Sequence, residues 1–169
     1  GLDNLVGDDS GSREIKELLS KLIIKPWVLA TSVKLNQKAL DNFEEVEKTL
    51  IKWAEVAADI NVKYLRIFPS HAELNKEDIV KMLKLASDVV KDYPIELLLE
   101  THGYISKGKD MKEVLDKADT DNIFAIWDIA HTTVNGETVS EAYDYISPYL
   151  KHVHIKDFAK VKEEGPDNP

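Results

Sequence analysis

Short apolar runs alternate with amphipathic segments along most of the chain. The run from Ile95 to Leu99 is interrupted only by Glu96, and such near-continuous runs are typical of strands buried on both faces of a parallel sheet. The same pattern predicts six strands in all, at about Leu2–Val6, Trp27–Val33, Tyr64–Phe68, Ile95–Glu100, Phe124–Asp128 and His152–Ile155.

The segments between these runs have the period of an amphipathic helix. Apolar residues recur three or four positions apart and form one stripe in each of the segments Val46–Ile60, Ile79–Val90 and Met111–Ala118. Asn75 is a suitable N-cap, and Thr138 followed three residues later by Glu141 resembles a capping box. Pro94 ends one helical pattern just before the strand at Ile95.

Strand–helix alternation of this kind is typical of either a doubly wound open sheet or a closed (β/α) barrel. Gly103 and Gly108 have the wrong spacing for a dinucleotide-binding loop, and we interpret both as turn glycines. We expect one α/β domain over residues 1–169. As a (β/α) barrel it would have about six of the eight strand–helix units, because a full barrel takes about 250 residues. The chain starts inside a strand–helix unit and ends in a loop, so the first and last units are the ones expected to be missing.

Composition adds few constraints. Hydrophobic residues make up 43% and charged residues 31% of the chain, an ordinary globular mixture. The absence of cysteine excludes disulfides and thiolate metal sites. No apolar run is long enough to cross a membrane and no signal peptide is evident, so we expect a cytoplasmic protein.

The formal net charge of −9 weighs against binding to nucleic acid, whose phosphates carry the same sign of charge. Lys156, Lys160 and Lys162 are the nearest approach to a basic cluster. Acidic residues stand among them, and we interpret this end of the chain as a solvated segment of mixed charge.

The residues that could carry chemistry fall at the ends of three successive predicted strands. Glu100 and Asp128 each close a strand, and His154 lies in the strand after that. Each is separated from the next by roughly 27 residues, which is close to one strand–helix unit of a barrel. Neighbouring parallel strands lie about 4.8 Å apart, so these side chains can share one cation. Two carboxylates and an imidazole suit Mn²⁺, Mg²⁺, Co²⁺, Fe²⁺ or Zn²⁺, and the sequence does not choose among them.

Taken singly, each of these residues has an ordinary structural explanation. A glutamate at a strand end often caps a helix, an aspartate there often forms a turn, and a strand histidine often packs in a core. Their coincidence at equivalent points of three units is what favours a site. His152 shares a face with His154 and is either a deeper supporting group or part of the packing. Arg66 lies within a strand, where it either binds an anionic substrate or pairs with a carboxylate.

At these positions the sequence resembles the xylose-isomerase-like superfamily of sugar phosphate isomerases and epimerases. The specific element is Trp127-Asp128-Ile129-Ala130-His131 followed by His152-Val153-His154-Ile155-Lys156-Asp157, that is, Asp-x-x-His and then His-x-His-x-Lys-Asp. Further matching stretches are Tyr64-Leu65-Arg66-Ile67-Phe68 and Leu97-Leu98-Leu99-Glu100-Thr101-His102-Gly103.

The resemblance implies a TIM barrel that holds one divalent metal ion through Glu100, Asp128 and His154. It also implies proton abstraction next to a carbonyl, with Glu100 and His131 as catalytic residues. His102, His131 and Arg66 would contact the substrate. The fourth ligand of the family is a glutamate on the last strand; Glu163 and Glu164 follow no apolar run, and neither is assigned this role.

The activity expected from the resemblance is a metal-dependent isomerase or epimerase whose partner is a small sugar or sugar phosphate. Three alternatives share the barrel: a metal-dependent dehydratase, a phosphodiesterase like endonuclease IV, and a non-catalytic remnant that binds a sugar. The charge and the small number of histidines, five in all, weigh against the phosphodiesterase. We expect no nucleic acid and no membrane partner, and a homo-oligomer remains open.

Overall fold

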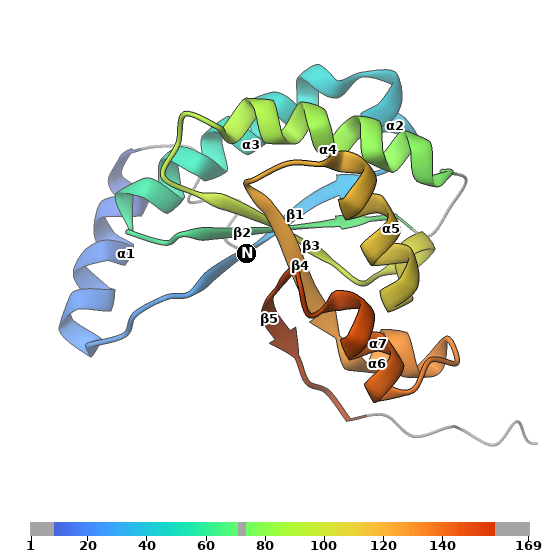
Figure 1. The fold of residues 1–169 in the computed structure, drawn as a ribbon. Helices are drawn as coiled ribbons and strands as arrows, with labels where there is room; N and C mark the ends of the chain where they lie inside the picture. The colour runs from blue at the N-terminus through green and yellow to red at the C-terminus, as the bar shows by residue number, and fades with distance from the viewer. Residues whose placement is uncertain (1–8, 71–73, 158–169) are drawn as a thin grey trace, which may run out of the picture.

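A computed structural model describes residues 9–70 and 74–157 of the chain. Within these ranges the strands form one parallel sheet in the order β1-β2-β3-β4-β5, so each strand pairs with its successor in the sequence. Figure 1 shows α2, α3 and α4 lying along one side of this sheet, with α5, α6 and α7 following around its curved end. This is the arrangement of a partial (β/α) barrel, one of the two architectures left open by the strand–helix alternation and the one implied by the family resemblance.

Five of the six predicted strands are confirmed, with bounds that differ by a few residues. The fifth strand begins and ends earlier than predicted, and Ile155 beyond it is 83% exposed. The predicted strand Leu2–Val6 lies outside the described residues. The observed strands are β1 (Val28–Leu35), β2 (Tyr64–Pro69), β3 (Glu96–Glu100), β4 (Ile123–Asp128) and β5 (Leu150–His154).

The predicted amphipathic stripes correspond to α3, α4 and α5, and both predicted caps are present. The side chain of Asn75 accepts a hydrogen bond from the backbone of Asp78, and Thr138 forms a capping box with Glu141. Further helices that no predicted stripe covers complete the set. In full, the helices are α1 (Asp9–Leu22), α2 (Gln37–Asp41), α3 (Phe43–Asp59), α4 (Lys76–Val90), the 3₁₀ turn η2 (Gly103–Ile105), α5 (Gly108–Ala118), α6 (Ile129–Val134) and α7 (Val139–Ile146).

Each strand has two faces with different environments. Alternate residues such as Leu97 and Leu99 are fully buried against the helices in the main core. Leu98, between them, faces the other way and packs in a separate cluster with Tyr64 and Ile126 on the concave face of the sheet. Because side chains alternate along a strand, Glu100 lies on the same concave face as Leu98.

The sheet is open within the described residues, since its order begins at β1 and ends at β5 without a pairing between these two. The prediction of an incomplete barrel is therefore confirmed for this part of the chain. None of the helices in the described ranges combines the length and the apolar composition that crossing a membrane requires.

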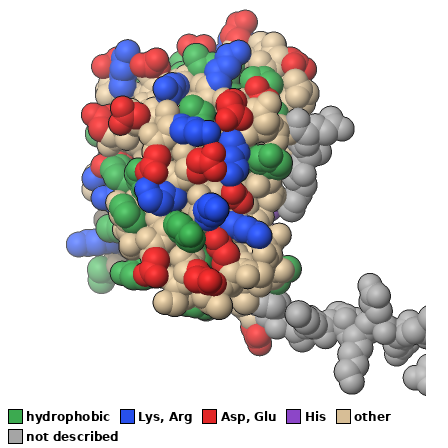
Figure 2. Space-filling model, turned by 45° about the vertical axis from the view of Figure 1, so that its right-hand side comes forward, with side chains coloured by type: hydrophobic (Ala, Val, Ile, Leu, Met, Phe, Trp, Pro, Cys, Tyr) green, Lys and Arg blue, Asp and Glu red, His purple; other side chains and the backbone are tan. Residues whose placement is uncertain are grey.

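Ion pairs connect the outer surfaces of α4 and α5. Lys76 lies 2.6 Å from Asp110 and 2.5 Å from Glu113, while Lys117 contacts Glu77 and Glu113. Hydrogen bonds from Lys76 and Lys117 lower the pKa of Glu113 to about 2. Figure 2 shows the same interspersion of basic and acidic side chains over one face of the molecule. The net negative charge is thus locally balanced on this surface.

Gly108 is a point of close approach between helices rather than a flexible turn. Its φ is not positive, unlike those of Gly103 and Gly136. A Cβ at Gly108 would lie 2.8 Å from the carbonyl oxygen of Ala142 in α7 and 2.9 Å from the Ala142 Cα, so the backbone of one helix would have to move. We therefore expect Gly108→Ala to lower the free energy of unfolding by about 2–3 kcal/mol, measured by urea denaturation.

Gly136→Ala is the matched control for this substitution. Nothing lies within 4 Å of a Cβ at Gly136, but its φ is +88°, so only backbone strain of about 1 kcal/mol is expected. Equal losses in the two variants would show that close packing of α5 on α7 is not what requires Gly108.

Candidate metal centre

The functional residues lie on the concave face of the sheet, at the carboxyl ends of its strands. Glu100 is the last residue of β3 and Asp128 the last residue of β4. His154 ends β5 and is the register partner of Asp128. Val153, between His152 and His154, packs against the main core, so both histidines face the concave side. Parallel pairing therefore brings the three predicted ligands to one edge.

The carboxylate of Glu100 has a partner on each oxygen. His154 Nδ1 lies 2.7 Å from Oε1, in a hydrogen bond that the carboxylate accepts. Arg66 Nε lies 3.5 Å from Oε2, and the guanidinium is stacked 4.6 Å from the centre of the Phe68 ring. Arg66 also donates a hydrogen bond to the carbonyl oxygen of Thr31. Of the two roles considered for Arg66, the structure shows pairing with a carboxylate; contact with a substrate stays a prediction.

Asp128 has two oxygens in different roles. Oδ1 caps α6 by accepting a hydrogen bond from the backbone N–H of His131 at 3.2 Å. Oδ2 is buried and lies 2.6 Å from Lys156 Nζ, an ion pair without hydrogen-bond geometry. Among the described residues none donates a hydrogen bond to this oxygen. Thr101 holds the backbone of Asp128 in place. Its hydroxyl accepts a hydrogen bond from the Asp128 N–H at 2.8 Å and lies 3.3 Å from the Asp128 carbonyl oxygen.

The three side chains fit a divalent cation. One ligand atom from each of Glu100, Asp128 and His154 lies within 4.8 Å of the other two. Ligand atoms about 2.1 Å from a shared ion lie about 3 to 4.2 Å from one another, so only small side-chain shifts are required. The unbonded Asp128 Oδ2 is an acceptor for such an ion, since buried carboxylate oxygens are normally satisfied. An O/O/N set of this kind suits several divalent metals.

The remaining predicted histidines line the same site. The rings of His102 and His131 lie 4.8 Å apart, and His131 Nε2 is 3.7 Å from Asp128 Oδ2. His102 Nδ1 is 3.1 Å from the carbonyl oxygen of Pro69, which fixes the orientation of the ring. His152 packs edge-on against His154 at 5.3 Å. All the predicted site residues are therefore brought together.

Burial lowers the pKa of His131 below its ordinary value; Lys156 and His102 lower it further, while Asp128 and Glu100 oppose the shift. Burial also lowers the pKa of His152, and the neighbouring His154 adds to this shift. Both rings are therefore mainly neutral at neutral pH, and a neutral imidazole can accept as well as donate a hydrogen bond.

Two supporting residues belong to the stretches that match the family but were given no role from the sequence. Lys156 is exposed, as expected for a solvated segment, but its ammonium also pairs with the buried Asp128. The sequence feature that points to this role is the position of Lys156 two residues after His154. Lys160 and Lys162 lie outside the described residues. Thr101 is fully buried beside Asp128, and its only signal was its position directly after Glu100.

Comparison with known families identifies this arrangement. The family model of the xylose isomerase-like TIM barrel matches residues 3–168, almost the whole chain. The chain belongs to the xylose isomerase-like TIM barrel family. The predicted family and fold class are thereby confirmed, whereas the roles of individual site residues stay predictions. Among curated proteins, no sequence matches the chain.

Several solved structures share the fold of this chain at low sequence identity. The probable 3-DHS dehydratase AsbF from Bacillus anthracis has a TM-score of 0.75 and 17% identity, covering 90% of this chain and 57% of its own. The 3-keto-D-glucoside 4-epimerase YcjR from E. coli has a TM-score of 0.76 and 15% identity, covering 90% and 65%. The IolI protein with a binding zinc atom has a TM-score of 0.66 and 19% identity, covering 82% and 53%. The chain thus spans between about half and two thirds of the length of these barrels.

Proposed function

We propose that this chain provides the metal-binding part of a divalent-metal-dependent sugar or sugar phosphate isomerase or epimerase. The observation that carries the proposal is the convergence of Glu100, Asp128 and His154 at the carboxyl ends of three successive strands. Active sites of TIM barrels lie at this end of the strands. The zinc atom bound by the IolI protein supports a metal in a barrel of this kind.

Glu100 is the proposed acid/base group. Its carboxylate is 7% exposed and held from both sides by His154 and Arg66, so its position in the site is defined before a substrate arrives. Glu100 accepts the proton from the carbon next to the substrate carbonyl, and the electron pair of the C–H bond moves towards the carbonyl oxygen. A divalent cation, when bound, polarises the oxygens of the substrate. Delivery of a proton to the neighbouring carbon, with the hydroxyl proton there moving to the former carbonyl oxygen, completes an isomerisation. Delivery of a proton to the opposite face of the same carbon completes an epimerisation.

His131 is proposed to contact a substrate oxygen. Its imidazole is about a quarter exposed and mainly neutral, so it can donate to or accept from a hydroxyl group. His102 lies against it and is proposed to bind a second polar group of the substrate. Arg66 holds Glu100 in place and is proposed to contact the substrate through the rest of its guanidinium.

The complete activity belongs to a complete barrel. Inversion at carbon needs acid/base groups on both faces of the reacting atom, and Glu100 provides one of them. The second is expected from elements that close the barrel next to β1 and β5. We therefore propose the activity for the whole protein and the metal site for this chain.

The proposal predicts close to one divalent ion per chain. Elemental analysis after loading with Mn²⁺, Co²⁺ or Zn²⁺ and dialysis measures the metal content. The chemistry is tested by incubating the intact protein with Mn²⁺ and a panel of ketoses in deuterated water, because proton abstraction next to a carbonyl exchanges that hydrogen with solvent. Absence of bound metal with all three ions would remove the metal site from the proposal.

A dehydratase is the second candidate, and the similarity to the fold of the probable dehydratase from Bacillus anthracis supports it. It would use the same first step at Glu100 and then expel a hydroxyl group as water. The two activities differ in their products: a dehydratase gives an unsaturated carbonyl compound with a new ultraviolet absorbance, while an isomerase or epimerase gives a product of the same mass.

A further inference from the structure

A pocket of about 420 Å³ lies directly beside the candidate metal centre. It is formed between the turn after β3 and helix α6, and its described lining residues include Ser106, His131, Asn135 and Lys156. His131 and Lys156 are shared with the metal centre, because both lie against Asp128 Oδ2. A molecule held at the cation can therefore extend into this pocket.

The pocket is unusual for a chain of net charge −9. Among the described residues that line it, none is acidic, and Lys156 is the one lysine or arginine. Ser106 donates its hydroxyl hydrogen to the carbonyl oxygen of Gly103, and Asn135 donates to the carbonyl oxygen of His131. An ammonium group in this pocket would meet polar groups but no described counter-ion.

Lys156 and a metal ion compete for the same oxygen. The side chain of Asp128 is 1% exposed, and Oδ1 is already engaged in capping α6, so Oδ2 is the oxygen left for a cation. The ammonium of Lys156 now lies 2.6 Å from it. A divalent cation at this point repels the ammonium strongly over such a distance. The Lys156 side chain is 48% exposed and can turn away at little cost.

We propose that Lys156 is a specificity-determining residue that leaves Asp128 when the metal binds and then pairs, in the adjacent pocket, with an anionic group of the substrate. This inference rests on the proposed function and narrows it to substrates that carry a phosphate monoester or a carboxylate. Charge-assisted hydrogen bonds to such groups are among the stronger polar contacts in proteins. A neutral sugar would offer the displaced ammonium no charged partner.

The test uses Lys156→Met, which removes the charge but keeps most of the length, and Lys156→Arg, which keeps the charge. Titration calorimetry on the intact protein first measures the Kd of Mn²⁺. It then measures, at saturating Mn²⁺, the Kd of glycerol 3-phosphate, D-glycerate and neutral glycerol. Comparison of the first two ligands separates a phosphate site from a carboxylate site.

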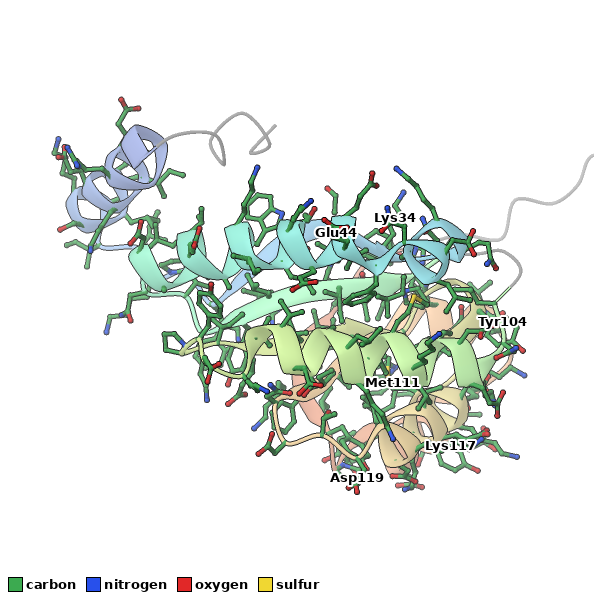
Figure 3. The ribbon with its side chains drawn as sticks, turned by 90° about the horizontal axis from the view of Figure 1, so that it is seen from above. Lys34, Glu44, Tyr104, Met111, Lys117 and Asp119 are labelled. Atoms are coloured by element: carbon green, nitrogen blue, oxygen red, sulfur yellow. The ribbon has the colours of Figure 1, made fainter. Side chains whose placement is uncertain are left out.

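Opposite changes in Lys156→Met are expected. Mn²⁺ should bind at least about threefold more tightly, because its competitor is gone. The preferred anion should bind about tenfold or more weakly, because its partner is gone. Lys156→Arg should retain the anion affinity. Lys117→Met is the matched control: Lys117 lies in α5 (labelled in Figure 3) and its ammonium pairs with Glu77 and Glu113 on the outer surface of the molecule, so both affinities should stay at parental values.

Anion binding that is unchanged in Lys156→Met, or equal binding of glycerol and the two anions by the parent, would overturn the inference while leaving the metal site intact. Weaker Mn²⁺ binding in Lys156→Met would show that Lys156 supports the ion instead of competing with it, and would also overturn it. A parent protein that binds no Mn²⁺ would instead contradict the proposed function.

Discussion

Asp128→Asn is expected to weaken the binding of Mn²⁺ at least about 100-fold, since even residues that only support metal ligands contribute 10–100-fold. Asparagine has the shape of aspartate and keeps the oxygen that caps α6, so the fold around His131 should be retained. What is lost is the negative charge at the buried oxygen that faces Lys156, Glu100 and His154. Titration calorimetry gives the affinity, and circular dichroism with thermal melting reports on the fold.

The matched control is Asp121→Asn. Asp121 lies before the other end of β4 and is exposed, so it carries the same chemical change without access to the site. Its Mn²⁺ affinity should equal that of the parent. If Asp128→Asn binds Mn²⁺ as tightly as Asp121→Asn, Asp128 is not a ligand and the centre proposed at the three strand ends is wrong.

Glu100→Gln is expected to reduce the rate of hydrogen exchange next to the substrate carbonyl by about 10³-fold, within the range for loss of one general acid/base group. The amide fills the same space between His154 and Arg66, but it cannot take a proton from carbon. Because glutamine is also a poorer ligand, the rate is measured at saturating Mn²⁺ with the bound metal quantified in the same sample. The expected loss is in kcat.

Glu96→Gln is the control for this experiment. Glu96 begins the strand that Glu100 ends, on the same face, and pairs with Lys63 at the opposite end of the sheet. It should affect stability and leave the exchange rate close to that of the parent. An exchange rate in Glu100→Gln equal to that in Glu96→Gln, with metal fully bound, would remove Glu100 from the proton transfer.

The sheet was predictable because its signal is local. The run that ends at Glu100 and the one that ends at Asp128 are largely apolar on both faces, as a parallel strand covered on both sides requires. The polar residue at the end of each run then lies at the carboxyl end of its strand, where the active sites of barrels are found. Three such strand ends, each one strand–helix unit from the next, were enough to predict the cluster of Glu100, Asp128 and His154.

The contacts between units were not predictable, because they depend on how the units pack. The pairing of Lys156 with Asp128 joins residues from different units and depends on where the chain turns after β5. The need for glycine at Gly108 likewise depends on how closely α5 approaches α7, and nothing in the sequence near Gly108 reports the position of Ala142. Spacing along the chain therefore identified the candidate ligands, but only the structure shows which residues contact them.

The strand order β1-β2-β3-β4-β5 also bears on how the molecule is made. After β1, each strand of the described sheet pairs with the one synthesised just before it. The sheet can therefore grow one unit at a time as the chain leaves the ribosome, without waiting for a distant segment. The loops closed at each step have the length of one strand–helix unit, which keeps the entropic cost of each addition small. The candidate ligands belong to the last three strands of this series, so the metal centre is the last part of the described sheet to be assembled.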